Sequence, residues 1–134
     1  MMKSMLKCKI HRATVTDAVL HYEGSVTIDK KLMDAAGLVE YEQVHIWNVD
    51  NGNRFTTYVI DGEPDSGVIC LNGAAARQVS KGDLVIIAAF SSYDEKELAN
   101  FQPTLVYVDR KNRITGVKRK VESESQRPRV AAAV

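Results

Sequence analysis

The sequence predicts a mainly β protein with little helix, whose short strands form a barrel or a sandwich. Its 134 residues are the size of one ordinary domain and are enough to bury a core. Apolar residues alternate with polar ones or form short runs, and turn signals such as DNGN at 50–53 separate these runs. Because a closed barrel leaves no sheet edge exposed, it suits a chain of many short strands.

Eight strands are expected, each rich in Val, Ile, Thr or aromatic residues. Gly, Pro, Asn, Asp and Ser, which favour turns, separate most of them. In chain order the predicted strands span residues 5–11, 19–22, 25–28, 43–49, 55–60, 67–71, 83–89 and 104–108.

Two short helices are predicted between the strands. Asp29 is placed to cap a helix over residues 30–36, and Gly37 follows at the position where helices commonly end. Asp94 can cap a second short helix that runs to Ala99.

The formal net charge of +1 argues against a dedicated nucleic-acid-binding protein, in which basic residues should dominate. The charge is unevenly distributed. Residues 109–134 hold eight basic and three acidic residues, a net charge of +5, which leaves −4 on residues 1–108. From about residue 109 the chain is also poor in large apolar residues and contains Pro128, which predicts a mobile tail.

Cys8 and Cys70 lack the spacing of a disulfide framework or a zinc site, and both are interpreted as small apolar strand residues. Apolar runs are too short to span a membrane, and charged residues interrupt the N-terminus before a signal-peptide core could form. The sequence therefore predicts a cytoplasmic protein that binds no membrane, nucleic acid or metal.

The segment HYEGSVTI at 21–28 places a Gly-Ser pair between residues that favour strands. The pair can be an ordinary turn, in which Gly24 supplies an unusual backbone angle and Ser25 caps it. It can also be reactive, because the Ser25 hydroxyl can attack the neighbouring Gly24 carbonyl and convert the amide to an ester. β-Elimination and hydrolysis, with release of ammonia, would then leave a pyruvoyl group. The pair alone does not distinguish these two interpretations.

Four segments, in order, closely resemble the pyruvoyl-dependent aspartate 1-decarboxylase family. MLKCKIHRATVT at 5–16 is similar to the family's opening strand, and HYEGSVTID at 21–29 to its self-cleavage site. IWNVDNGNRFTTY at 46–58 is similar to its substrate and processing segment, and NGAAA at 72–76 to its oxyanion and substrate loop. The resemblance implies a six-stranded double-psi β-barrel with short helices, and a homotetramer with active sites between adjacent subunits.

The resemblance also implies self-cleavage between Gly24 and Ser25. This would give a short chain of residues 1–24 and a long chain of residues 25–134 that begins with the pyruvoyl group. That group, formed covalently from Ser25 without metal or pyridoxal phosphate, would form a Schiff base with L-aspartate and accept the electrons released as carbon dioxide leaves. The product would be β-alanine, for pantothenate and coenzyme A biosynthesis.

The resemblance implies a role for each matching residue. Ser25 and Tyr58 would be catalytic, with Tyr58 as the proton donor. The guanidinium of Arg54 offers the planar fork that fits a substrate carboxylate, and Asn72 and nearby backbone amides can hold an oxyanion. Thr57 would touch substrate and polarise the Gly24 carbonyl during cleavage. The implied substrate-binding residues are Lys9, Arg54, Thr57, Asn72, Gly73, Ala74 and Ala75.

Two alternatives come from other functional classes. The chain could be an uncleaved β-barrel that serves as an interaction domain, with Gly24-Ser25 as a simple turn. It could also be a nucleic-acid-binding module whose basic tail contacts phosphates. The acidic body and the lack of an aromatic stripe for base stacking argue against the second alternative.

Overall fold

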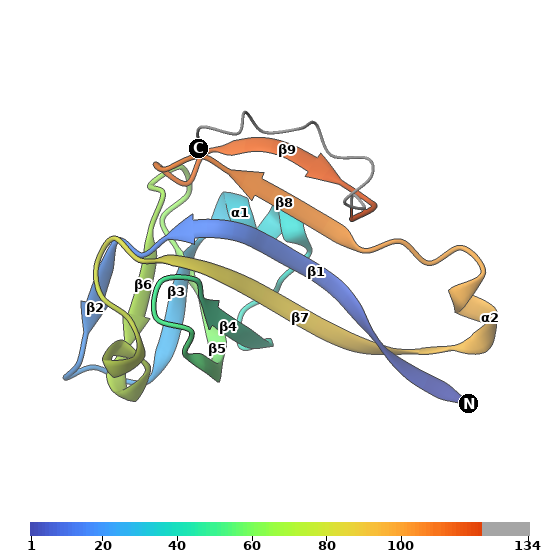
Figure 1. Cartoon of the computed structure of the whole chain (residues 1–134), viewed down its shortest axis with the longest axis horizontal. Coiled ribbons are helices and arrows are strands. Elements are labelled where there is room, and N and C mark those ends of the chain that lie inside the picture. The colour runs from blue at the N-terminus through green and yellow to red at the C-terminus, as the bar shows by residue number, and fades with distance from the viewer. Residues whose placement is uncertain (122–134) are drawn as a thin grey trace, which may run out of the picture.

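The computed structural model describes residues 1–121, and over this range the chain is mainly β with short helices (Figure 1). The predicted fold class is therefore confirmed. The strands are β1 (Met2–Thr14), β2 (Asp17–Val19), β3 (Ser25–Asp29), β4 (Gln43–Asn48), β5 (Arg54–Gly62), β6 (Ile69–Asn72), β7 (Leu84–Asp94), β8 (Thr104–Val108) and β9 (Ile114–Lys118). The helices are α1 (Lys30–Ala36), α2 (Glu95–Leu98) and the 3₁₀ helix η1 (Gly73–Gln78).

The sheet closes into a barrel. Its hydrogen-bonded order is β2-β6-β3-β5-β4-β7-β1-β8-β9, and β2 and β1 are consecutive chain segments separated only by Val15 and Thr16. Thr16 completes the circuit, because its backbone N–H donates to the carbonyl oxygen of Ile69 on β6 over 2.8 Å. With β1 and β2 counted as one bent strand, the barrel has the six strands that the resemblance implies. The β8–β9 hairpin lies outside it, paired to β1.

The core forms where strand side chains alternate into the barrel. On β4, Val44 and Ile46 are fully buried, whereas His45 and Trp47 point outward and are partly exposed. Full burial of one such aliphatic side chain contributes roughly 1.5–3 kcal/mol. Other fully buried strand residues include Ile10, Val26, Ile28, Leu71 and Ile87.

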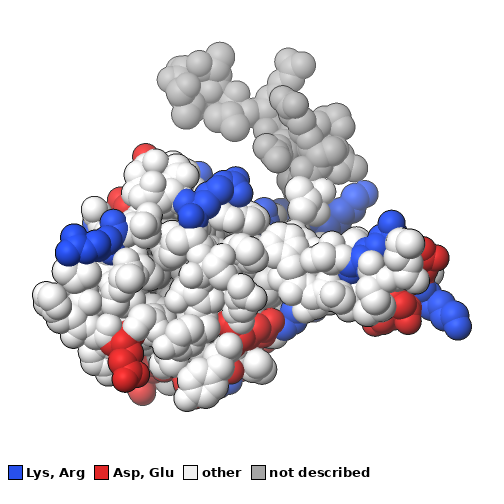
Figure 2. Space-filling view, turned by 90° about the horizontal axis from the view of Figure 1, so that it is seen from below, with Lys and Arg blue, Asp and Glu red and all other residues white. Residues whose placement is uncertain are grey.

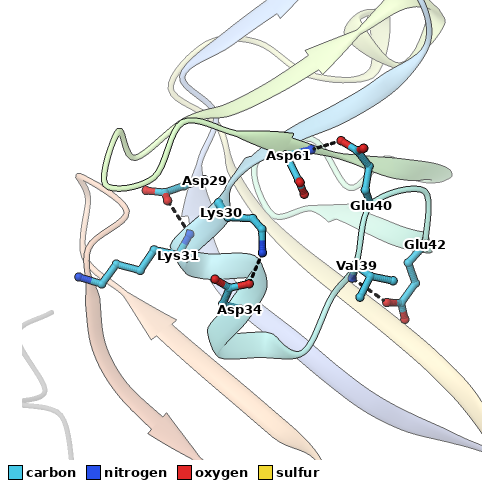
Figure 3. Close-up of polar contacts among 8 residues, drawn as sticks. All are labelled: Asp29, Lys30, Lys31, Asp34, Val39, Glu40, Glu42 and Asp61. Carbon is cyan, nitrogen blue, oxygen red and sulfur yellow. Dashed lines mark hydrogen bonds and ion pairs between the residues drawn. The ribbon is translucent and has the colours of Figure 1, made fainter.

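Helix α1 begins and ends where the sequence predicts. The carboxylate of Asp29 caps it by accepting from the backbone N–H of Lys31 over 2.9 Å, and Gly37 ends it in the left-handed conformation (Figure 3). The same buried carboxylate accepts two more backbone N–H groups from the loop before β6. Because β3 runs from Ser25 to Asp29, this anchor fixes the far end of the strand that carries Ser25. Helix α2 is capped by Asp94, also as predicted.

The second predicted strand is wrong in position. A strand is expected over residues 19–22, but β2 ends at Val19 and the chain then bends as far as Ser25. The sheet order gives the reason. Strands β2 and β3 pair with opposite edges of β6, so residues 20–24 must cross the end of β6 to connect them.

The predicted tail begins too early. A tail is expected from about residue 109, but Ile114–Lys118 forms β9 in an antiparallel pair with β8. Asn112, in the turn between them, holds this hairpin to the barrel through hydrogen bonds to Thr14 and Gly67. The remainder of the predicted tail, residues 122–134, lies outside the described residues.

Figure 2 shows basic and acidic side chains scattered over one face, with uncharged surface between most of them and both signs close together at its narrow end. Among residues 1–121 there is no cluster of three or more His, Cys, Asp or Glu side chains placed to hold a metal ion. Within the same range no helix is long and apolar enough to cross a bilayer.

Candidate active site

An open pocket beside the start of β3 brings together residues from three separate segments. The crossover before β3 contributes Gly24, and η1 contributes Ala74 and Ala75. Strand β5 contributes Thr57 and Tyr58. Five of the residues that the sequence singles out therefore share one pocket.

The pairing of β3 with β5 explains why the cleavage pair lies at this pocket. The two strands are parallel, and their register starts with Val26 opposite Val59. Strand β3 begins one residue earlier, at Ser25, so the cleavage pair lies at the end of β3 where this pairing starts. Gly24, Thr57 and Tyr58 line the same pocket at this end.

Ser25 is the first residue of β3 and is only 3% exposed. Its Oγ accepts a hydrogen bond from Nδ2 of Asn72 over 3.0 Å, and its hydroxyl donates to the carbonyl oxygen of Glu23 over 3.5 Å. Asn72 is 4% exposed and lies directly opposite Ser25 in the antiparallel β3–β6 ladder. This hydrogen bond is thus shielded from water, where an oriented donor has a stronger electrostatic effect.

Gly73 allows the start of η1 to approach the cleavage pair. Its φ is +67°, and a Cβ at this position would lie 2.7 Å from Cα of Gly24 and 2.8 Å from the backbone nitrogen of Gly24. No side chain fits at such distances, so only glycine is compatible with this close contact. Gly73 therefore packs directly against the backbone of Gly24.

Strand β5 presents its predicted site residues on two faces. Alternation points Arg54 and Tyr58 outward, where both are exposed, and points Thr57 inward with the fully buried Val59. The ring of Tyr58 lies near that of Tyr41, with 6.4 Å between centroids. Thr57 and Tyr58 therefore reach the same pocket from opposite faces of the strand.

The two predicted substrate cations do not line this pocket. Arg54 lies over the Trp47 ring, with its Cζ 4.9 Å from the ring centroid. Lys9 is on β1 opposite Ala88 of β7, and β7 and β4 separate it from β5. Three strand spacings put β1 roughly 14 Å from β5 along the sheet. A single chain thus keeps Lys9 and Arg54 apart from Gly24.

Sequence reasoning missed Thr27 and Cys70, which both contact Asn72. Nδ2 of Asn72 also donates to Oγ1 of Thr27 over 3.0 Å, and the Cys70 thiol donates to Oδ1 of Asn72 over 3.3 Å. The sequence does contain one signal for them: Thr27 is two residues after Ser25, and Cys70 is two residues before Asn72. Residues i and i+2 of a strand share a face, so each lies on the same face as a predicted site residue. That signal is useful only once β3 is known to pair with β6.

The fold and the site together define a small β-barrel protein with a pocket lined by Gly24, the residue before a buried serine. The chain belongs to the aspartate decarboxylase family, whose model matches residues 1–115. The family resemblance carried by the four sequence segments is therefore confirmed.

Several relatives are aspartate 1-decarboxylases. That of Syntrophus aciditrophicus is 63% identical over 85% of this chain and 98% of its own length. That of Dehalococcoides mccartyi strain 195 is 61% identical over 90% of this chain and 98% of its own length. That of Paraburkholderia phymatum is 56% identical over 93% of this chain and 98% of its own length.

Two designed proteins are similar among solved structures. The rationally designed mkDPBB_sym_86 protein is 19% identical with a TM-score of 0.44, and the match covers 57% of this chain and 90% of that chain. The computationally designed msDPBB_sym2 protein is 22% identical with a TM-score of 0.42, and the match covers 63% of this chain and 96% of that chain.

Proposed function

We propose that this chain is a pyruvoyl-dependent aspartate 1-decarboxylase, which converts L-aspartate to β-alanine and carbon dioxide for pantothenate biosynthesis in the cytoplasm. Membership of the family and the names of its relatives support this activity. The structural observation that carries the proposal is the buried hydroxyl of Ser25, which accepts an amide N–H from Asn72 beside Gly24. A simple surface turn would not need a buried donor of this kind.

The first chemical event is cleavage of the bond between Gly24 and Ser25. Oγ of Ser25 attacks the Gly24 carbonyl carbon, the C–N bond breaks, and the amide becomes an ester. Loss of the Ser25 Cα proton and of the Cβ–Oγ bond releases a carboxylate at Gly24 and leaves dehydroalanine. Water then displaces ammonia from it to give the ketone. Thr57, which lines the same pocket as Gly24, is the proposed donor to the Gly24 carbonyl oxygen.

The residues around Ser25 fit a pyruvoyl group at this position. Asn72 offers its buried Nδ2 donor there, and the absence of a Cβ at Gly73 leaves the backbone of Gly24 room. Once formed, the group supplies a ketone that condenses with the substrate amine and an electron sink for loss of the carboxylate. The protein must then hold the substrate carboxylates, exclude water and return a proton.

Tyr58 is the proposed acid that returns this proton. Its side chain lines the same pocket as Gly24, and a phenol can donate without carrying a permanent charge. Ala74 and Ala75 line the same pocket with small side chains, so backbone amides of η1 are accessible to a substrate carboxylate.

A dicarboxylate substrate also needs cations, and this requirement supports an assembly of subunits, which we propose to be a homotetramer. Lys9 is three strands away from β5, and neither Lys9 nor Arg54 lines the pocket of its own chain. Stacking on Trp47 restricts the orientation of the Arg54 guanidinium, which can then offer two parallel N–H donors to one carboxylate. In the proposed assembly, the outer face of one subunit brings these cations to the pocket of its neighbour.

The test combines intact mass with a decarboxylation assay on the purified protein. We expect two fragments, residues 1–24 and 25–134, with the longer one lighter by one ammonia than a simple hydrolysis product. Carbon dioxide release should be much faster from L-aspartate than from L-glutamate, because an added methylene misplaces one of two fixed carboxylates. A single uncleaved chain without a borohydride-reactive carbonyl would overturn the proposal and leave the interaction domain as the better interpretation.

A further inference from the structure

Four polar side chains share one face of the β3–β6 ladder. In this antiparallel pair Ser25 lies opposite Asn72, and Thr27 lies opposite Cys70. The residues between them, Val26 and Leu71 among others, are fully buried on the other face. Because side chains of residues i and i+2 point the same way, Ser25, Thr27, Cys70 and Asn72 form a continuous cross-strand group.

Asn72 is the centre of this group, and both ends of its amide are engaged. Its Nδ2 donates to the hydroxyl oxygens of Ser25 and Thr27, each at 3.0 Å. Its Oδ1 accepts from the thiol of Cys70 at 3.3 Å. Nearly all of this amide is removed from water, since Asn72 is 4% exposed. The protein groups must therefore determine which way the amide faces.

The two hydroxyl groups favour this orientation only weakly. A hydroxyl can donate or accept, and the bond from Ser25 to the carbonyl oxygen of Glu23, at 3.5 Å, is too long to hold the Ser25 proton firmly away from the amide. A thiol donates an S–H but is a poor acceptor, so the Cys70 end of the amide is best occupied by Oδ1. Cys70 is thus the group in this cluster that most strongly favours one orientation over the other.

The Cys70 thiol keeps the proton that this hydrogen bond requires. Partial burial raises its pKa, and the nearby carboxylate of Asp17 raises the pKa further. At neutral pH the side chain is therefore a donor rather than a thiolate. A thiolate would favour the opposite orientation of the Asn72 amide, because it would attract Nδ2 and so turn Oδ1 toward Ser25.

We propose that Cys70 is a positioning residue for self-cleavage, and that its thiol holds Asn72 in the orientation that presents Nδ2 to Oγ of Ser25. The proposal rests on the proposed function. As Oγ of Ser25 gives up its proton, it gains negative charge, which an N–H donor stabilises and an amide oxygen repels. When Oγ then bonds to the Gly24 carbon, this charge passes to the Gly24 carbonyl oxygen. A turned amide would thus oppose the reaction without any change in the fold.

The test is the cleavage rate of pulse-labelled chains, followed on denaturing gels, for wild type, Cys70→Ala and Cys70→Ser. Loss of one neutral hydrogen bond should slow cleavage about 2- to 10-fold in Cys70→Ala. Cys70→Ser restores a donor and should cleave within about twofold of wild type. The matched control is Cys8→Ala, which removes the other strand cysteine and should leave the rate unchanged.

A double variant separates positioning from a general structural role. If Cys70 acts through Asn72, adding Cys70→Ala to Asn72→Ala should not slow cleavage further. If Cys70→Ala does not fold, the cleavage rate of the near-isosteric Cys70→Val, which has no donor, is compared with that of Cys70→Ser, which has one. Equal rates for the donor and non-donor variants, or additive effects with Asn72→Ala, would overturn the positioning role. An uncleaved wild type would overturn the proposed function as well.

Discussion

Asn72 lies directly opposite Ser25 on paired strands, and its Nδ2 donates to Oγ of Ser25 over 3.0 Å between side chains that are 4% and 3% exposed. The donor is in place before any reaction, held by the β3–β6 ladder rather than by a loop. A preorganised donor of this kind needs no rearrangement as charge develops on the oxygen. The pairing of β3 with β6 thus positions a hydrogen-bond donor for the hydroxyl that is proposed to attack the Gly24–Ser25 bond.

Ser25→Ala should fold but remain uncleaved and inactive. The variant lacks the attacking hydroxyl, and the fold should survive because Nδ2 of Asn72 keeps its second hydrogen bond, to Thr27. Intact mass and carbon dioxide release from L-aspartate measure the two losses. The control is Ser80→Ala, at an exposed position, which should be cleaved like wild type. Cleavage of Ser25→Ala at the same bond would rule out the hydroxyl as the nucleophile.

Gly73→Ala should block cleavage and destabilise the fold. A Cβ would lie 2.7 Å from Cα of Gly24, so the backbone beside the scissile bond must move. Gly37→Ala is a matched control, because Gly37 also has a positive φ, at +78°, but nothing lies within 4 Å of a Cβ there. That control should carry only the backbone strain, roughly 1–2 kcal/mol, and should still be cleaved. Denaturant unfolding measures the loss of stability in each variant, and intact mass measures cleavage. Equal cleavage in both variants would contradict the prediction, because it would mean that the contact with Gly24 does not matter.

Local signals in the sequence were sufficient for much of this fold. Asp29 and Gly37 mark the ends of α1 because capping depends on neighbouring residues, which one sequence shows. The sequence does not predict β9, because the charged residues on either side of it, at 109–113 and 119–120, resemble a solvated tail. Its stability comes from pairing with β8 and from Asn112, whose partners Thr14 and Gly67 are far away in the sequence.

The same limit applies to the site. Ser25, Thr57 and Tyr58 could be named from their motifs, because each lies within a short continuous segment that resembles the family. Thr27 and Cys70 could not, because their contact with Asn72 depends on which strands pair and in which register. Register is a tertiary property, and alternation within one strand does not fix it.

Asn112→Ala should destabilise the fold by about 2–5 kcal/mol, since buried backbone groups would lose their partners. The side chain is 2% exposed, donates to the carbonyl oxygens of Thr14 and Gly67 at 2.8 Å each, and accepts from the Thr14 N–H at 2.7 Å. Urea unfolding measures the loss. Asn100→Ala, at an exposed turn, is the control and should change stability by less than about 0.5 kcal/mol. A loss below about 1 kcal/mol for Asn112→Ala would show that the hairpin is held mainly by other contacts.

Stability should fall at alkaline pH partly because of Cys8. Burial of its side chain raises the pKa of the thiol from 9.0 to about 11. Between these values the unfolded chain releases the proton and the folded chain keeps it, so the free energy of unfolding falls as pH rises. The loss attributable to Cys8 should reach roughly 2–3 kcal/mol by about pH 11.

Cys8→Ala isolates this contribution, because the variant has no thiol to titrate. It should be less stable than wild type at pH 7, owing to lost packing, but the gap should narrow from about pH 9 upward. Urea unfolding of both proteins across this range measures the gap. A constant difference between them would mean that the Cys8 thiol does not titrate in this window.

The last prediction separates formation of the pyruvoyl group from its use, and it follows from the two faces of β5. Thr57 points inward and lines the same pocket as Gly24, so Thr57→Val should keep the strand but leave most chains uncleaved. Tyr58 points outward, lines the pocket and is needed only after cleavage. Tyr58→Phe should therefore fold and cleave normally but decarboxylate L-aspartate about 10² to 10⁴ times more slowly, the usual contribution of a positioned acid. Intact mass reports cleavage and carbon dioxide release reports turnover. A Tyr58→Phe protein with the wild-type turnover rate would assign proton donation to another group or to a bound water.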